Sequence, residues 1–316
     1  LLIEILLIEI LLIEILLIEI LLIVMLPIGM LRGMLLTPAT MLPQVTPMRV
    51  RTWCKAPTRR ARKMRYEVPR MRDWLKHRAE ERELMDDFSK GGEELKEALR
   101  HLRRLNRIFG AAGPTLYGVR RLWAEAGKPR RLAILDIGSG SGEINRHLLR
   151  WADASGVELD IVLTDITEEA CGEAALVFRG EPRVRVERGD LFGLPEACAD
   201  VVTATQFAHH FSTGELPRVV RTMLGASRIG IVINDIHRHW IPWTAAWLVT
   251  RLVSRNRYIR HDGPLSVAKG FRANEWRSLL EAVGSADVQD WSVVWRPMFR
   301  HVVIAKKERL HDGADA

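Results

Sequence analysis

Three glycines stand on alternate positions directly after a short apolar run that ends in an acid. The stretch reads ILDIGSGSGEI, and its key residues are Asp136, Gly138, Gly140 and Gly142. Glycine lets a backbone turn tightly and approach a ligand, and in a parallel sheet such a ligand lies across the carboxyl ends of the strands. The spacing therefore predicts a turn that holds a nucleotide.

Two common nucleotide-binding turns do not fit this spacing. A dinucleotide turn has the pattern G-x-G-x-x-G, which from Gly138 places Glu143 where the third glycine belongs. A phosphate-binding loop requires Lys-Ser or Lys-Thr, and this stretch has neither. A glycine-rich turn without any ligand is the alternative interpretation.

Two further acids follow predicted strands later in the chain. VLTDI ends with Asp165, and an acid at that point can accept hydrogen bonds from both hydroxyls of a ribose. RGDLFGLP contains Asp190 and Leu191 after the next strand, although Asp190 could equally be a turn or helix-capping acid. Each motif is weak alone, but three in chain order, each after a strand, form a joint signal.

These motifs lie on an alternation of strands and helices. The apolar strands are RLAILDI, VELDIVLTDI, VRVERGD, DVVTATQF and RIGIVINDI. Helices predicted over 141–151, 168–178 and 213–224 separate them, which indicates a parallel sheet covered on both faces. A helix over 273–283 then precedes ADVQDWSVVW and MFRHVVIAK, whose short connection predicts an antiparallel hairpin.

Over about residues 84–306, this combination resembles the class I S-adenosylmethionine-dependent methyltransferases. The resemblance implies an α/β fold with a doubly wound, mostly parallel seven-stranded sheet of the Rossmann-like methyltransferase type, an antiparallel C-terminal hairpin and N-terminal helices. It also implies S-adenosylmethionine as the cofactor, with Asp165 on the ribose, Asp190 on the adenine amino group and Leu191 on the ring. The implied cofactor-binding set is Asp136, Gly138, Gly140, Gly142, Asp165, Ile166, Asp190, Leu191 and Gln206.

The residues after the fourth strand, QFAHHF (206–211), bear on the acceptor. Family members that methylate adenine N6 or glutamine amides carry Asn or Asp, then Pro-Pro and an aromatic residue, at this point. This departure is similar to the small-molecule branch, including enzymes of quinone biosynthesis, and RHDGPLSV resembles methyltransferases associated with polyketide biosynthesis. We therefore expect a small apolar or aromatic acceptor, methylated at a hydroxyl group, and no nucleic-acid partner.

An insert over 237–270 follows the fifth strand. It contains an apolar helix with Trp240, Trp243 and Trp247. A polar hinge is predicted next, at 260–262. One interpretation is a lid over a planar or lipophilic acceptor, and the other is a helix that packs on the sheet with tryptophan as core.

Histidines on these segments are candidates for a general base. A phenol with a pKa of about 10 benefits from a base, and histidine suits that role near neutral pH. We predict His261 as the base, oriented by Asp262 or Asp235, with His210 as the second candidate. Each could also be a structural histidine, and an activated carbon or amine acceptor needs no base.

Two other functional classes stay open. The basic helix around 100–107 would suit a methyltransferase that acts on RNA or protein, although a large acceptor needs an open face. A catalytically silent cofactor-binding module is the other, and the intact glycine and acid motifs disfavour it. The three cysteines, Cys54, Cys171 and Cys198, have no paired spacing, so they predict no metal site and fit a reducing cytoplasm.

The chain is uneven in composition before the predicted domain. Residues 1–20 are four copies of LLIEI, whose period of five gives no coherent apolar face. Residues 49–72 hold ten Lys or Arg and one Glu, so this segment carries a charge of +9. The net charge of the whole chain is +8, which leaves −1 for all other residues. The positive net charge is therefore weak evidence for nucleic-acid binding. We expect 1–72 to be a disordered or non-native extension, with a membrane-associating segment as the alternative.

The remaining boundaries follow from the elements. A helical region is predicted over 73–130, with helices at 93–109 and 116–126, and the catalytic domain over 131–308. Residues 309–316 are expected to be a disordered tail. We expect a cytoplasmic protein without stable membrane insertion, and the sequence leaves its oligomeric state open.

Overall fold

The computed structural model describes residues 75–87, 91–284 and 288–307. Contacts within the chain divide it into two units, Leu1–Lys76 and His77–Ala316, and the fold and the site lie in the second. The predictions for residues 1–72 and 309–316 fall outside the described residues. Within the described part, none of the helices combines the length and apolar character that crossing a membrane requires.

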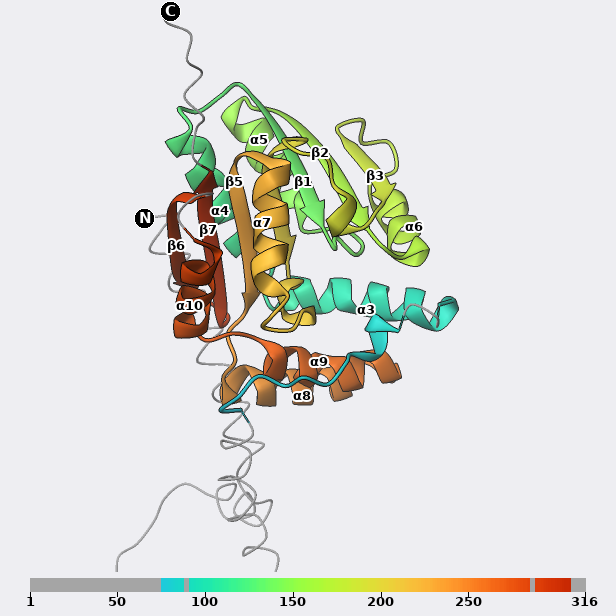
Figure 1. Cartoon of the computed structure of the whole chain (residues 1–316). Coiled ribbons are helices and arrows are strands. Elements are labelled where there is room, and N and C mark those ends of the chain that lie inside the picture. The colour runs from blue at the N-terminus through green and yellow to red at the C-terminus, as the bar shows by residue number, and fades with distance from the viewer. Residues whose placement is uncertain (1–74, 88–90, 285–287, 308–316) are drawn as a thin grey trace, which may run out of the picture. The chain divides into compact units, whose positions relative to one another are not determined.

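Seven strands form one sheet in the order β3-β2-β1-β4-β5-β7-β6 (Figure 1). The strands are β1 (Arg131–Ile137), β2 (Glu158–Asp165), β3 (Val184–Arg188), β4 (Ala199–Thr205), β5 (Ser227–Ile236), β6 (Val288–Arg296) and β7 (Arg300–Lys307). The first five run parallel, whereas β7 is antiparallel to both of its neighbours. The predicted seven-stranded, mostly parallel sheet with a C-terminal hairpin is confirmed.

Helices cover both faces of the sheet because the central strands bury apolar side chains on both sides. The helices are α3 (Glu93–Ile108), α4 (Ala112–Glu125), α5 (Asn145–Ser155), α6 (Glu168–Val177), α7 (Leu216–Ala226), α8 (Trp240–Val253), α9 (Arg257–Lys269) and α10 (Ala273–Val283). One apolar core joins the sheet to α7 and α10, and the other joins it to α4, α5 and α6. Figure 1 shows α3, α8 and α9 at the edge where the parallel strands end.

The strand order reverses at β1, which pairs with β2 on one side and with β4 on the other, so that Ile134 lies opposite both Ile161 and Val201. In a doubly wound sheet, this reversal opens a crevice outside the carboxyl ends of the strands. Three short 3₁₀ helices line that region: η1 (Leu84–Asp86), η2 (Leu191–Gly193) and η3 (Ala208–His210). The fold therefore assembles the predicted strand-end motifs at one edge.

Two helix boundaries differ from the prediction. Helix α4 begins at Ala112 and not at residue 116, because Pro114 lies in its first turn, where the missing N–H needs no partner. Helix α5 begins at Asn145 and not at residue 141, because the glycine turn occupies the residues before it. In both cases the first residue of the helix is determined by the proline or glycines near it and not by the spacing of apolar residues.

The predicted polar hinge at 260–262 is wrong, since these residues lie inside α9. Asn256 caps this helix by accepting a hydrogen bond from the Tyr258 N–H at 3.0 Å. Gly263 lets α9 pack closely on α8, because a Cβ there would lie 2.6 Å from Thr250 Cγ2. The Gly-Pro pair at 263–264 thus serves helix packing and does not break the helix.

Replacing Gly118 with Ala should destabilise the fold. An added Cβ would lie 2.5 Å from Val232 Cγ1, in the buried contact of α4 with β5. Overpacking of this kind costs about 1–3 kcal/mol of unfolding free energy, which chemical denaturation measures. Gly172→Ala is the matched control, because it is also helical but has nothing within 4 Å of the added Cβ. Equal stability of the two variants would contradict the α4–β5 packing.

Candidate functional site

The glycine turn follows β1 directly, as predicted. Gly138, Gly140 and Gly142 have φ values of 59°, 55° and 65°, which L side chains rarely adopt. A Cβ on Gly138 would lie 2.2 Å from the Phe207 ring, and one on Gly142 would lie 2.4 Å from Leu163 Cδ1. The turn is therefore packed against β2 and the segment after β4, with its backbone free to face a ligand.

Asp136 lies beneath this turn and is fully buried. Its carboxylate accepts hydrogen bonds from Thr203 Oγ1 at 2.7 Å and from Asn145 Nδ2 at 2.6 Å. Burial raises the pKa of Asp136 to about 6, against the lowering effect of these two hydrogen bonds. The predicted cofactor residue Asp136 thus ties β1 to β4 and α5 and does not line the crevice.

The other two acids lie at the ends of their strands. Asp165 accepts hydrogen bonds from the Gly140 N–H through Oδ2 and from the Thr167 N–H and Oγ1 through Oδ1, each at 3.0 Å. Asp190 caps η2 by accepting from the Phe192 N–H at 3.1 Å. Asp165 is therefore connected to the glycine turn itself.

One cavity of about 980 Å³ lies over these strand ends. Seven of the nine predicted cofactor residues line it, and Asp136 and Gly142 do not: the lining members are Gly138, Gly140, Asp165, Ile166, Asp190, Leu191 and Gln206. Its other walls come from α3, η1, η3 and the inner face of α9. The cavity thus extends from the glycine turn to a second group of polar residues.

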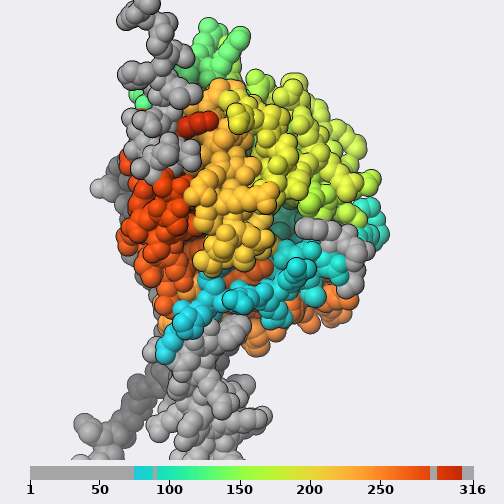
Figure 2. Space-filling model, in the orientation of Figure 1, coloured from blue at the N-terminus to red at the C-terminus, as the bar shows by residue number. Residues whose placement is uncertain are grey.

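Residues 77–87, here called the strap, cross the molecule beside this cavity, and Figure 2 shows them as a cyan band. Arg78 donates hydrogen bonds to the carbonyls of Lys269 (2.8 Å) and Phe211 (3.0 Å), and its guanidinium stacks over the Phe271 ring at 4.2 Å. These contacts join the strap to α9 and to the segment after η3.

Asp262 holds the other end of the strap. Its carboxylate accepts the backbone N–H groups of Leu84 at 2.8 Å and Met85 at 3.0 Å, so it caps η1 from α9. This anchoring directs two acids of the strap, Glu83 and Asp86, to the cavity. Asp262 was predicted as a catalytic partner of His261, and the structure places it as the anchor of η1.

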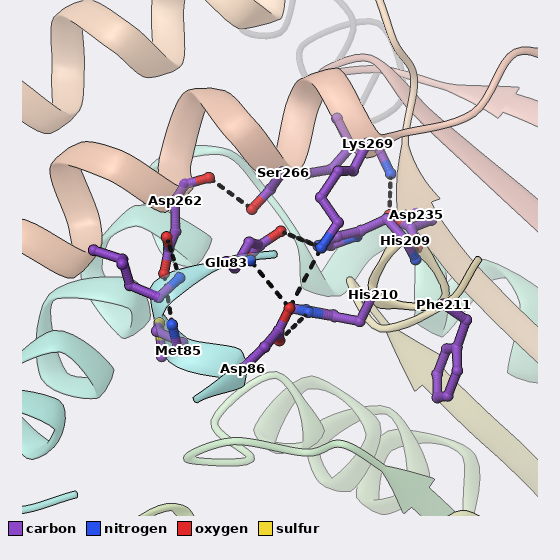
Figure 3. A network of polar contacts seen from close by, with 12 residues as sticks. Glu83, Met85, Asp86, His209, His210, Phe211, Asp235, Asp262, Ser266 and Lys269 are labelled. Carbon is purple, nitrogen blue, oxygen red and sulfur yellow. Dashed lines mark hydrogen bonds and ion pairs between the residues drawn. The ribbon is translucent and has the colours of Figure 1, made fainter. Parts of the chain in front are cut away.

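A network of ionisable groups lies at this end of the cavity (Figure 3). The polar cluster, as we call it, consists of Glu83, Asp86, His209, His210, Asp235 and Lys269. His209 is buried, with Nδ1 2.7 Å from Asp235 Oδ1 and Nε2 3.5 Å from Glu83 Oε1. Burial alone would lower the pKa of His209, but the charges and hydrogen bonds of Asp235 and Glu83 outweigh it and raise the pKa to about 9.

The neighbouring histidine has its own carboxylate. His210 is half-buried and its Nδ1 lies 2.6 Å from Asp86 Oδ1. Burial would raise the pKa of Asp86, but the hydrogen bond and charge of His210 and the charge of Lys269 lower it to about 2. A proton on Nδ1 that is donated to this carboxylate leaves the His210 Nε2 lone pair as an acceptor.

Lys269 supplies a buried positive charge between the two acids of the strap. Its Nζ lies 3.4 Å from both Glu83 Oε1 and Asp86 Oδ2. Glu83, His209 and His210 also offer ligand atoms within 4.8 Å of one another, a geometry that could hold a metal ion. Because the Lys269 ammonium already neutralises Glu83, we assign no metal to this group.

The first-choice base, His261, does not line the cavity. Its Nδ1 lies 2.8 Å from Asp262 Oδ1 and its Nε2 3.4 Å from Glu81 Oε1. The hydrogen bond to Asp262 is the largest cause of a raised His261 pKa. The second choice, His210, is in the cavity wall together with His209, which the sequence interpretation did not select.

One of the two interpretations made Trp240, Trp243 and Trp247 part of a lid over the acceptor, but none of the three lines the cavity. Helix α8 packs on α9 through Ala245, Ala246 and Thr250, and α9 supplies the cavity wall. The insert therefore does cover the site, but its second helix forms the wall and its tryptophans lie outside.

Comparison with known proteins supports the fold. The family profile described as "Methyltransferase domain" matches residues 134–230. The plantazolicin methyltransferase BpumL in complex with SAH is similar, with a TM-score of 0.54, 12% identity, and coverage of 78% of this chain and 100% of that chain. The CurJ carbon methyltransferase has a TM-score of 0.51 and 14% identity, covering 80% of this chain and 71% of that one.

A further structure has a lower TM-score and a smaller matched region. The citrinin polyketide synthase CMeT domain matches with a TM-score of 0.41 and 18% identity, and the match covers 55% of this chain and 46% of that chain, less than half its length. A comparison with curated protein sequences gives no match. The strand order β3-β2-β1-β4-β5-β7-β6 and the glycine turn after β1 agree with the Rossmann-like methyltransferase fold, and residues 134–230 match the methyltransferase-domain profile.

Proposed function

We propose that this protein transfers the methyl group of S-adenosylmethionine to a hydroxyl group of a small apolar or aromatic acceptor. One observation carries the proposal: a single cavity joins the strand-end cofactor motifs to the polar cluster. A donor at one end and an acceptor at the other would then meet inside one cavity. Such positioning is the main contribution that a protein makes to methyl transfer, because the sulfonium leaving group is already activated.

The cofactor end suits a nucleoside that carries a positive charge. Asp165 would accept the ribose hydroxyls, Asp190 the adenine amino group, and Leu191 would pack on the ring. The backbone of the glycine turn would approach the rest of the cofactor. Glu143, Asp165 and Asp190 all line this end, so its acidic rim favours a sulfonium.

The acceptor end combines apolar walls with the polar cluster. Its apolar lining residues are Met85, Leu102, Leu105, Phe207, Phe211 and Ile259. The cavity volume of about 980 Å³ is at the upper end of the range of roughly 300–1,000 Å³ for ligand pockets, so an acceptor fits beside the cofactor. Apolar walls with one polar end favour a compact acceptor that carries few hydroxyl groups.

His210 is the base that this arrangement favours. Its Nε2 would take the acceptor proton while Asp86 orients the ring and stabilises the resulting imidazolium. The oxygen would then attack the methyl carbon as the carbon–sulfur bond breaks, leaving the cofactor as a neutral thioether. His209 is less suited, because a pKa of about 9 keeps it protonated at neutral pH, and His261 lies outside the cavity wall.

Cofactor binding should depend on Asp165. Asp165→Ala is expected to weaken S-adenosylmethionine binding by about 1.5–3 kcal/mol, because hydrogen bonds between a charged acceptor and the ribose are lost. Calorimetry gives the dissociation constants, with Asp153→Ala as the control, since Asp153 is an exposed acid on α5. Equal binding by both variants, or tighter binding of NAD than of S-adenosylmethionine, would contradict the proposal.

Turnover should depend on His210 more than on His261. His210→Ala is expected to lower kcat by roughly 10²- to 10⁴-fold on a neutral phenolic acceptor, as loss of a general base does, with cofactor affinity unchanged. Acceptors that are already ionised at the assay pH should be spared. His261→Ala is the matched control and should keep kcat within a few fold. A larger loss in His261→Ala would restore His261 as the base.

Stability should fall in alkaline solution because of His209. Its folded-state pKa of about 9 exceeds the unfolded value near 6.5, so its contribution is fully present below about pH 6.5 and is lost as the pH rises through 9. The contribution is on the order of 3 kcal/mol, which is the free-energy equivalent of raising the pKa from 6.5 to about 9. Urea unfolding between pH 6 and 10 should show this decline in the wild type and a flatter profile in His209→Gln. Parallel profiles would show that His209 is not a buried cation.

A further inference from the structure

Helix α8 forms the outer layer beyond α9 and buries little of itself. Its buried residues are Ala245, Ala246 and Thr250, which form one narrow row of small side chains. Its last turns instead expose Trp247 (40%), Leu252 (74%) and Val253 (47%). Large apolar side chains grouped this way on an outer helix indicate an interaction surface, whereas single exposed ones do not.

Cationic side chains surround these apolar residues. The Arg251 guanidinium lies over the Trp247 ring, 4.3 Å from its centroid. Arg255 is exposed in the connection to α9, and it forms no ion pair with the part of the chain that the structure describes. Arg257 does have a partner, Glu94, at 3.0 Å. The end of α8 therefore carries two cations that no carboxylate of the described residues neutralises.

Helix α3 extends this surface. His101 Nδ1 lies 2.8 Å from Ser254 Oγ, which fixes the side of α3 that borders the end of α8. Residues three and seven positions further lie on the same side of a helix. These are Arg104, which is exposed, and Ile108, which is 54% exposed. Helix α3 thus adds one exposed cation and one exposed apolar side chain on the side that borders the end of α8.

We propose that this surface docks on an anionic phospholipid membrane. The docking surface consists of Arg104, Ile108, Trp247, Arg251, Leu252, Val253 and Arg255. Tryptophan and aliphatic side chains enter the boundary between headgroups and acyl chains, while arginines bind lipid phosphates, and each cation near an anionic surface contributes about 1 kcal/mol. Binding of this kind is peripheral, because the side chains reach only the headgroup region and the acyl-chain boundary.

The location of this surface matters for the site beneath it. Helix α9 lies between α8 and the cavity, and Ile259 and Asp262 on α9 line the cavity. Docking through α8 would therefore bring the acceptor end of the cavity to within one helical layer of the lipid. The inference stands on the exposed residues alone and does not require that the proposed hydroxyl acceptor is correct.

The test is co-sedimentation of the full-length protein with phospholipid vesicles. Vesicles of phosphatidylcholine alone are compared with vesicles that also contain phosphatidylglycerol. The wild type should bind the anionic vesicles, and Leu252→Glu and Arg255→Glu should each weaken binding at least about tenfold. The matched controls are Leu176→Glu, on the 57% exposed apolar residue of α6, and Arg179→Glu, on an exposed arginine. Both should bind as the wild type does.

Each contrary result is distinguishable. Equal binding of all five proteins would overturn the docking surface, because residues outside it would then account for membrane attachment. The choice of partner would be overturned if the wild type bound no vesicles. It would also be overturned if the protein formed dimers, or bound single-stranded RNA, only when Leu252 and Arg255 are intact. Cofactor affinity should be the same in every variant, since none of the substituted residues lines the cavity.

Discussion

The site depends on two hydrogen bonds that cross from α9 to the strap. The carboxylate of Asp262 accepts the N–H groups of Leu84 and Met85, and hydrogen bonds to a charged group contribute about 1.5–3 kcal/mol each. They act on η1, a single turn that has little stability of its own. Without them, Glu83 and Asp86 have no fixed position, and the polar cluster loses two of its three carboxylates.

The charges of the polar cluster compensate one another inside the protein. Glu83, Asp86 and Asp235 face the cations His209 and Lys269, and the His210 ring contacts Asp86. Removing one partner from a buried ionic network leaves an uncompensated charge, which costs more than the pair itself contributes. Three carboxylates face two cations, which leaves one negative charge over, and a proton that moves onto His210 would neutralise it.

Local chemistry made much of this structure predictable. The strands and the hairpin follow from the spacing of apolar residues along the chain. The glycine turn follows from glycines at positions of positive φ. Both signals lie within a few adjacent residues. Glu83, Asp86 and Lys269 could not be found in this way, because the packing of the strap on α9 brings together residues up to 186 positions apart, from Glu83 to Lys269. The predicted base, His261, does not line the cavity, and the reason is related. A polar hinge was predicted at 260–262, but these residues lie inside α9, and the sequence does not reveal that Gly263 packs on Thr250 of α8.

The closeness of Gly138 to Phe207 connects the two halves of the reaction. The Phe207 ring occupies the space that a side chain at Gly138 would need, and His209 and His210 follow two and three residues later on η3. A cofactor that restricts the motion of the glycine turn would also restrict the Phe207 ring. The start of η3, which follows Phe207, would then be held in place as well. Linkage makes such an effect mutual, so the two ligands raise each other's affinity. Occupation of either end of the cavity would then favour occupation of the other, whichever ligand binds first.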